Sequence, residues 1–365
     1  MKRILHVVGA RPNYMKIAPL VREMSNYPRD FTQVLLHTGQ HYDDNMSKIF
    51  FDELEMPRPD INLEVGSGTH AEQTAQVMLR FESVLADFNP DWVVVPGDVN
   101  STLACALVAV KLGIRIAHIE AGLRSFDRTM PEEINRLLTD QIADLLFTTA
   151  PEARENLARE GIAPEKIHFV GNTMIDTLVR LMPLARKRWP FLSAEFGIDR
   201  FVLVTLHRPS NVDDAEALRE IISALNEVSN ELPVIFPVHP RTRARIYEFG
   251  VTVNEKLKLV EPIGYVDFLA LQAQADVVVT DSGGVQEETT FLGVPCLTVR
   301  PNTERPVTIT TGTNRLVQTD RVAIVGSVRS CLQGAASGSK PRPALWDGKS
   351  AERIVSVFLE SKTVV

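Results

Sequence analysis

The sequence predicts an α/β protein with two doubly wound parallel sheets facing each other across a cleft, and three observations support this. Short, continuously apolar segments alternate with amphipathic helical segments. The alternation starts a second time near residue 200, and polar clusters directly follow the predicted strands. Strands buried on both faces are apolar throughout, and their alternation with helices is typical of right-handed βαβ units. A chain of 365 residues also exceeds one typical domain, so we expect two.

In the first half, runs rich in Val, Ile and Leu predict five strands: Ile4–Val8, Thr32–Leu36, Trp92–Val95, Arg115–Ile119 and Leu145–Thr148. Helical periodicity between them predicts four helices: Ile17–Ser25, Ala71–Phe88, Ser101–Leu112 and Pro131–Ala143.

The pattern restarts after a connecting segment, residues 171–199. The predicted strands of the second half are Phe201–Leu206, Val234–Pro237, Leu257–Val260, Val277–Thr280 and Pro295–Val299. The predicted helices are Ala215–Ser229, Gly284–Leu292 and a last one at Ser350–Leu359. We therefore expect a first domain at 1–172 and a second at 173–345, with a final helix at 349–361 that packs back on the first domain.

Composition excludes several classes of protein. The formal net charge of -7 disfavours a nucleic-acid binder, which needs a basic face. The three cysteines, Cys105, Cys296 and Cys331, have no metal-ligand spacing and do not form a disulfide framework. No segment is apolar enough for a membrane span, and no export signal is recognisable. We expect no bound metal, no membrane or nucleic-acid partner, and a cytoplasmic location.

Three polar clusters follow strands of the first half. The first contains Arg11 and Lys16, which could hold an anion near a helix N-terminus. The second contains Asp98, and the third contains Glu120. An acid at the end of an apolar strand needs a partner or a chemical role. Ordinary turns, a capping aspartate and an ion pair between Glu120 and Arg124 are the alternatives to a functional site.

Two further positions carry candidate residues. Glu132 and Arg136 are four residues apart at a predicted helix start, so a surface ion pair is the favoured interpretation from spacing alone. His207 follows the first strand of the second half, beside Arg208. A single histidine is more often structural than catalytic, but the strand end is the expected place for a site.

The segment after Val277–Thr280 is the most informative. Ser282, Gly283 and Gly284 precede a helix, and paired glycines let backbone N–H groups approach a phosphate. Glu288 lies one turn further on, where it could accept both ribose hydroxyls. Arg305 follows the next strand and adds a cation. A glycine turn that serves only packing is the alternative.

Together these segments resemble the non-hydrolysing UDP-N-acetylglucosamine 2-epimerases. The resemblance runs almost end to end, and the motifs that carry it are GARPNYMK, TGQHYDDNM, PGDVNST, HIEAGLRSFDRTMPEEINR, TLHRPSN and DSGGVQEETTFLGVPCLTVRPNTERP. It implies the fold of the GT-B glycosyltransferases: two Rossmann-like domains, with the nucleotide mainly in the second.

The resemblance also implies roles for individual residues. It makes Asp98, Glu120 and Glu132 the catalytic acids and His207 the histidine near the leaving diphosphate. It places around the substrate Arg11, Lys16, Arg136, the uracil contact Phe268, the phosphate loop Ser282, Gly283 and Gly284, the ribose ligand Glu288, and Arg305. Gln40 and His41 match part of a site at which substrate activates some bacterial members, although Asp43 replaces a family Gln. Two other departures are Asn13 and Val307, where the common family form has Glu.

The activity that the resemblance implies is epimerisation at carbon 2 of UDP-N-acetylglucosamine, without a nicotinamide or other cofactor. UDP leaves, the carbon 2 proton is lost, and UDP adds back after reprotonation on the other face. A homodimer that supplies cell-surface polysaccharide synthesis is further implied. The alternatives are a GT-B glycosyltransferase, a hydrolysing epimerase, a non-catalytic nucleotide-sugar sensor, and an epimerase for a modified UDP-acetamido sugar.

Overall fold

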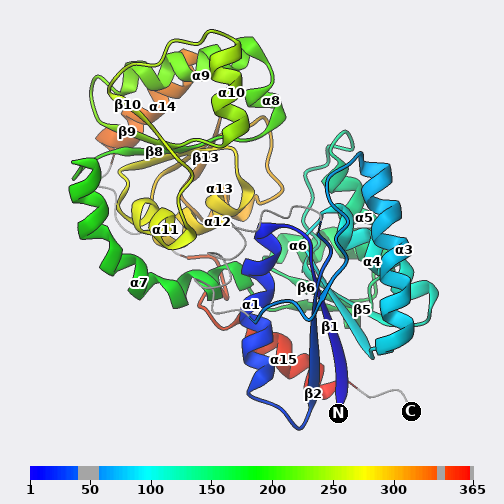
Figure 1. Ribbon diagram of the computed structural model, residues 1–365. Helices are drawn as coiled ribbons and strands as arrows, with labels where there is room; N and C mark the ends of the chain where they lie inside the picture. The colour runs from blue at the N-terminus through cyan, green and yellow to red at the C-terminus, as the bar shows by residue number, and fades with distance from the viewer. Residues whose placement is uncertain (40–56, 335–341, 362–365) are drawn as a thin grey trace. The chain divides into compact units, whose positions relative to one another are not determined.

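The computed structural model describes residues 1–39, 57–334 and 342–361 and divides them into two compact units (Figure 1). The first unit comprises Met1–Arg180 and the chain from Ala344 on, and the second comprises Leu181–Pro343. Each unit contains one parallel sheet with helices, which confirms the predicted two-sheet α/β class. Among the described helices, none is long and apolar enough to cross a membrane.

The first unit contains a seven-stranded sheet in the order β3-β2-β1-β4-β5-β6-β7, with every pair parallel. Its strands are β1 (Lys2–Val8), β2 (Phe31–His37), β3 (Ile61–Asn62), β4 (Trp92–Pro96), β5 (Arg115–Ala121), β6 (Leu145–Thr148) and β7 (Ile167–Phe169). The strand order reverses between β1 and β4. Ligands of doubly wound sheets bind beyond the carboxyl ends of the strands at such a reversal.

The helices of this unit connect the parallel strands. They are α1 (Arg11–Ser25), α3 (His70–Phe88), α4 (Asn100–Lys111), α5 (Pro131–Ile142), α6 (Pro151–Arg159), the short 3-10 helix η1 (Pro164–Lys166) and α15 (Ser350–Glu360). The start of α3 is fixed by a capping box, in which Thr69 and Glu72 each accept the other's backbone N–H. Its inward stripe, Val77, Phe81 and Leu85, is buried in the core of the sheet.

The C-terminal segment returns to the first unit. Trp346 is buried and donates its indole N–H to the carbonyl of Thr149 at 2.9 Å. The Asp176 carboxylate accepts the first backbone N–H groups of α15, from Ser350 at 3.1 Å and Ala351 at 2.7 Å. These contacts satisfy donors that a helix start otherwise leaves unpaired. They place α15 beside α1, as Figure 1 shows.

The second unit contains a six-stranded sheet in the order β10-β9-β8-β11-β12-β13, again parallel throughout. Its strands are β8 (Val202–Thr205), β9 (Val234–Pro237), β10 (Leu257–Val260), β11 (Val277–Thr280), β12 (Cys296–Val299) and β13 (Asn314–Val317). The reversal of strand order lies between β8 and β11. The segments after these two strands therefore meet at the position expected for a ligand.

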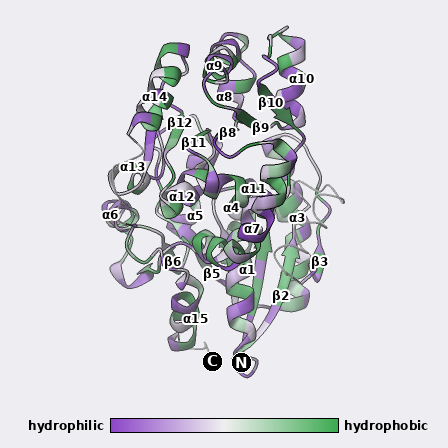
Figure 2. Cartoon of the chain, turned by 90° about the vertical axis from the view of Figure 1, so that its left-hand side faces the viewer, coloured by the Kyte–Doolittle hydropathy of each residue, from purple (hydrophilic) through white to green (hydrophobic). Residues whose placement is uncertain are grey.

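The helices of the second unit are α8 (Pro209–Val212), α9 (Ala215–Val228), α10 (Pro240–Glu248), α11 (Tyr265–Gln274), α12 (Gly283–Leu292), α13 (Val307–Thr310) and α14 (Arg321–Gln333). In Figure 2, α9 and α14 each carry both hydrophilic and hydrophobic colour. Their hydrophobic residues, among them Ile221 and Ile324, belong to the core of this unit. Helices that bury one face against a sheet have this amphipathic character.

Some elements differ from the sequence-based expectation. The connecting segment forms α7 (Thr173–Phe196), a 24-residue helix with Pro183 and Pro190 inside it. The predicted domain border lies where α7 begins, whereas the division between the two units falls within the helix, between Arg180 and Leu181. The elements that were not predicted are the helices α6, η1, α8, α10, α11, α13 and α14 and the strands β3, β7 and β13.

Candidate active-site residues

The turn after β1 is held by Asn13, which is buried. Its carbonyl oxygen accepts the backbone N–H groups of Gly9 at 3.1 Å and Ala10 at 3.0 Å, and its amide donates to the carbonyl of Pro96 at 3.2 Å. Asn13, one of the positions noted above as a departure, therefore ties the end of β1 to the end of β4.

Lys16 and Glu120 form a buried ion pair at the same edge of the sheet. The Nζ of Lys16 contacts Oε2 of Glu120, and both side chains are less than a tenth exposed. Glu120 has a φ of 72° and lies where the pairing of β5 with β6 shifts register, between Ile119 and Ala121. A bulge of this kind turns a side chain to a new direction, and a positive φ in a non-glycine residue is strained.

Gly97 leaves room for this ion pair. Its φ is 65°, and a Cβ at this position would lie 2.9 Å from the Nζ of Lys16. A larger residue would therefore be strained and would crowd the lysine.

Asp98 is paired with Arg136, at 2.7 Å between Oδ2 and Nη2. The other terminal nitrogen of Arg136 lies 2.9 Å from Oε2 of the buried Glu133. Glu133 also accepts the backbone N–H groups of Ser125 and Phe126, each at 2.9 Å. The expectation of a surface pair between Glu132 and Arg136 is wrong: Arg136 is buried, and it bridges Asp98 and Glu133.

Glu132 lies in the first turn of α5 and is half-buried. Within the part of the chain that the structure describes, its carboxylate has no hydrogen-bond or ion-pair partner. The first turn of a helix favours an acid through the helix dipole. Glu132 is thus the one predicted catalytic acid of the three whose carboxylate is not held by a described side chain.

Arg124 does not pair with Glu120, which was the structural alternative for this cluster. Its guanidinium lies 2.6 Å from Glu160 and 2.8 Å from Asp140 instead. Burial opposes the charge of Arg124, but the two carboxylates outweigh it and raise the pKa of Arg124 above its ordinary value.

In the second unit, His207 is oriented by Asp281. The imidazole Nδ1 lies 2.9 Å from the carboxylate, and the histidine side chain is half-exposed. The fully buried Asp281 also accepts the backbone N–H of Arg208 at 2.9 Å and the Asn211 amide at 3.1 Å. Burial would raise the pKa of Asp281, but these partners, His207 foremost, lower it. The carboxylate therefore fixes the imidazole and the turn after β8 together.

The segment 282–284 begins α12, with Ser282 as N-cap and Gly283 as the first helical residue. A Cβ at Gly283 would lie 2.4 Å from Nη1 of Arg305, so a side chain here would require this guanidinium to move. Arg305 is buried and pairs with Glu287, at 3.1 Å, and with Glu304. The predicted cation of the site therefore lies against the predicted phosphate loop, with two carboxylates beside it.

Glu288 is buried in α12 and accepts a hydrogen bond from the hydroxyl of Tyr265 in α11, at 2.7 Å. Burial raises the pKa of Glu288 to about 7, although the hydrogen bonds of Tyr265 and Gln272 act against the rise. Phe268 lies one turn after Tyr265 on α11 and is half-buried.

Three predicted residues are outside what the structure describes in full. Gln40 and His41 fall in 40–56, beyond the described residues. Arg11 begins α1, and only its backbone is described. Among residues 1–39, 57–334 and 342–361, no group of three or more His, Cys, Asp or Glu side chains is arranged to hold a metal ion.

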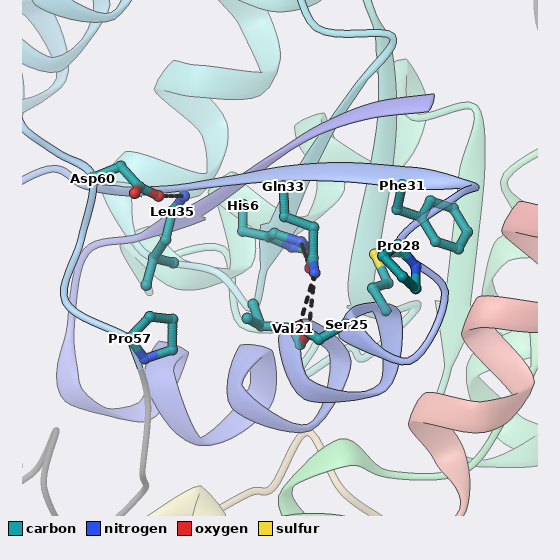
Figure 3. Close-up of a pocket in the computed structure, with 10 residues that line it drawn as sticks. His6, Val21, Ser25, Pro28, Phe31, Gln33, Leu35, Pro57 and Asp60 are labelled. Carbon is teal, nitrogen blue, oxygen red and sulfur yellow. Dashed lines mark hydrogen bonds between the residues drawn. The ribbon is translucent and has the colours of Figure 1, made fainter. Parts of the chain in front are cut away.

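A separate cavity of about 390 Å³ in the first unit contains none of the predicted site residues. Figure 3 shows His6 and Gln33 at this cavity, joined by a hydrogen bond of 2.9 Å. Gln33 donates in turn to the carbonyl of Val21 and the hydroxyl of Ser25 on α1. His6 is fully buried, and burial lowers its pKa to about 4.

Sequence reasoning missed the supporting residues Asp281 and Tyr265. Asp281 opens a predicted motif, but its partner His207 is 74 residues away in the chain. Tyr265 has no motif of its own. A signal for Asp281 was available, because it directly follows a continuously apolar strand. Asp98 and Glu120 also lie near the carboxyl ends of apolar strands.

Comparison with known proteins identifies the family. A family described as UDP-N-acetylglucosamine 2-epimerase matches residues 22–359. The UDP-N-acetylglucosamine 2-epimerase of Methanococcus maripaludis is 43% identical over 99% of this chain and 100% of its own. The UDP-2,3-diacetamido-2,3-dideoxy-D-glucuronate 2-epimerase of Pseudomonas aeruginosa is 43% identical over 90% and 92% of the two chains.

A solved structure agrees with these relatives. The crystal structure of the Methanocaldococcus jannaschii UDP-GlcNAc 2-epimerase in complex with UDP-GlcNAc and UDP has a TM-score of 0.90 to this chain. It is 43% identical and covers 98% of this chain and 100% of the other. The chain belongs to the UDP-N-acetylglucosamine 2-epimerase family.

Proposed function

We propose that this enzyme interconverts UDP-N-acetylglucosamine and UDP-N-acetylmannosamine by eliminating UDP and adding it back. The observation that carries the proposal is the pairing of acids and cations at the carboxyl edge of the first sheet, Glu120 with Lys16 and Asp98 with Arg136. This is the position at which ligands of doubly wound sheets bind. The family membership and the complexed relative support the same substrate.

The reaction needs a proton acceptor and a proton donor on opposite faces of carbon 2. Asp98, Glu120 and Glu132 supply three carboxyl groups for these tasks. Nearby carboxylates would also favour positive charge that develops on the sugar ring as UDP departs. Arg11 and Lys16 contact the sugar and the phosphates of the substrate. Arg136 holds the carboxylate of Asp98 in place.

The departing diphosphate carries the negative charge of the elimination. His207 stabilises it, with Nδ1 held by Asp281 and the imidazole half-exposed. The N-terminus of α12, at Ser282, Gly283 and Gly284, receives a phosphate through its backbone N–H groups. Three more residues complete the nucleotide site. The guanidinium of Arg305 adds a positive charge, Glu288 accepts the ribose hydroxyls, and Phe268 contacts the uracil.

A modified UDP-acetamido sugar is the second candidate substrate. The Pseudomonas aeruginosa relative, which is named for a 2,3-diacetamido glucuronate, is as identical to this chain as the Methanococcus maripaludis enzyme is. The family match does not favour the glycosyltransferase alternative.

We also propose that the enzyme is a cytoplasmic homodimer that supplies cell-surface polysaccharide synthesis, and that Gln40 and His41 belong to a site for activating substrate. The sequence resemblance supports these assignments. Sedimentation equilibrium of the purified chain tests the dimer, with an expected mass of twice 40.6 kDa.

Product analysis tests the proposed reaction. Purified enzyme is incubated with UDP-N-acetylglucosamine, or in parallel with the 2,3-diacetamido glucuronate analogue, and the mixture is separated by anion-exchange chromatography. We expect UDP-N-acetylmannosamine to appear, and the same equilibrium mixture to form when that product is the starting material. Free N-acetylmannosamine with UDP would indicate a hydrolysing enzyme, and turnover of the analogue alone would establish the second candidate.

A further inference from the structure

The strained bulge at Glu120 is held on both sides by one buried pair of residues, His118 and Asp140. Two residues before the bulge, Nδ1 of His118 lies 2.6 Å from Oδ1 of Asp140. Two residues after it, the backbone N–H of Gly122 donates to Oδ2 of Asp140 at 3.1 Å. Both side chains are fully buried. Positive φ at a non-glycine residue persists only where the surroundings impose it, and this pair is placed to do so.

The same histidine also holds the turn that carries Asp98. Its second ring nitrogen, Nε2, lies 2.7 Å from the carbonyl oxygen of Gly97. The backbone N–H of Gly97 in turn donates to the carbonyl of Ile119 at 3.0 Å. Both the backbone N–H and the carbonyl of Gly97, the residue before Asp98, are therefore hydrogen-bonded to residues of β5.

The hydrogen-bond partners of this histidine bear on its charge. A carbonyl oxygen only accepts, so Nε2 of His118 must carry a hydrogen. Asp140 faces the permanently charged Arg124 and the N–H of Gly122 through its other oxygen, which favours the carboxylate form. Burial would raise the pKa of Asp140, but His118 and Arg124 lower it. A carboxylate also only accepts, so Nδ1 must carry a hydrogen as well.

We propose that His118 is a buried imidazolium, and that His118 and Asp140 are positioning residues that fix Glu120 and Asp98 relative to each other. The second part rests on the proposed function, because it concerns the acids of that reaction. Neither residue contacts the reacting sugar in this scheme: His118 and Asp140 act through the backbone at 97 and at 120–122. The cations His118 and Arg124 are balanced by the carboxylates Asp140 and Glu160.

The chain supplies a matched control in His6. It is equally buried on a strand of the same sheet, but its Nε2 faces the Gln33 amide, and its Nδ1 has no hydrogen-bond partner among the described residues. No carboxylate is among its partners, and its pKa of about 4 makes it neutral at pH 7.5. The two histidines thus share burial and differ in predicted charge.

Nitrogen NMR of protein labelled at the histidine ring nitrogens tests the charge directly. In the solid state at pH 7.5, we expect two protonated nitrogens for His118 and one protonated, one unprotonated nitrogen for His6. His118→Gln and His6→Gln assign the signals by their loss. In Asp140→Asn, the imidazole of His118 should lose one proton. An unprotonated nitrogen at His118 in the unaltered protein would overturn the imidazolium assignment.

Kinetics test the positioning role. We expect Asp140→Asn and His118→Gln to lower kcat for epimerisation about tenfold or more, with KM changed less than about threefold and UDP affinity unchanged. His6→Gln should retain the original kcat. Variants that bind UDP and turn over at the original rate would refute the positioning role. If the unaltered enzyme does not act on UDP-N-acetylglucosamine, the proposed function fails, and the NMR signals still decide the charge of His118.

Discussion

At the scale of single residues, the predicted acids are distinguished by their partners. Glu120 is paired with Lys16 and Asp98 with Arg136, while Glu132 is held by no described side chain. The sequence indicates which residues carry charge at strand ends, because strand ends can be read from local hydrophobicity. It does not indicate the pairing: Lys16 and Glu120 are 104 residues apart, and only the folded sheet brings them together.

The first prediction concerns Glu120. Replacing Glu120 by Gln removes the charge and the proton-accepting oxygen at nearly constant volume, so kcat should fall by about 10²–10⁴-fold. UDP affinity, measured by isothermal titration calorimetry, should stay within about twofold, because the predicted phosphate loop is in the other unit. Glu82→Gln, at an exposed position on α3, is the control. Full turnover in Glu120→Gln would remove this residue from the chemistry.

The second prediction concerns the glycine beneath Arg305. A methyl group at Gly283 would lie 2.4 Å from the guanidinium and displace it, so Gly283→Ala should weaken UDP binding about tenfold or more. Gly326, in α14 of the same unit, has open space where its Cβ would lie. Gly326→Ala is therefore the matched control and should bind UDP normally. Equal affinities of the two variants in calorimetry would show that the close packing at Gly283 is not required.

The third prediction concerns pH and Glu288. Its pKa is raised from 4.5 to about 7 in the folded protein, so the folded state binds this proton more tightly than the unfolded state. The stability that this contributes is fully present below pH 4.5 and is lost as pH rises through 7, by up to about 3 kcal/mol.

Glu288→Gln removes the titrating group and with it this part of the pH dependence. Scanning calorimetry between pH 5 and pH 8 should therefore show a smaller loss of stability with rising pH in Glu288→Gln than in the unaltered enzyme. Parallel profiles of the two proteins would contradict the raised pKa.

At the scale of elements, the long hydrophobic strands and most of the long amphipathic helices were predicted, whereas α14 and the short or atypical elements were not. β3 has two residues and β7 three, too few for a recognisable pattern. The α10 sequence PRTRARIYE is mostly polar, and α7 contains two prolines, which usually end helices. Packing against the rest of the unit stabilises such elements, and that information is not local.

The fourth prediction concerns the start of α15. Asp176→Ala removes the acceptor of the N–H groups of Ser350 and Ala351, which should cost about 1 kcal/mol and loosen α15. Hydrogen exchange followed by mass spectrometry should show faster exchange in Ser350–Glu360. Asp87→Ala, at an exposed position near the end of α3, is the control and should leave this helix unchanged. Unaltered exchange in Asp176→Ala would mean that packing alone holds α15.

At the scale of the whole molecule, the predicted architecture rests on a repeated pattern rather than on any single motif. Two series of apolar strands, each followed by polar clusters, predicted two parallel-sheet units, and both sheets reverse strand order next to those clusters. Asp281 follows an apolar strand and could have been singled out, but the supporting roles of Asp140 near Glu120 and of Asp281 beside His207 could not be predicted. Their roles depend on contacts between elements distant in the chain.

The most direct test of the proposed chemistry is proton NMR of the enzyme with UDP-N-acetylglucosamine in heavy water, without added cofactor. Elimination and re-addition exchange the carbon 2 proton with solvent, so we predict that UDP-N-acetylmannosamine forms with deuterium at carbon 2. Epimerised product that keeps its original proton at carbon 2 would contradict the account.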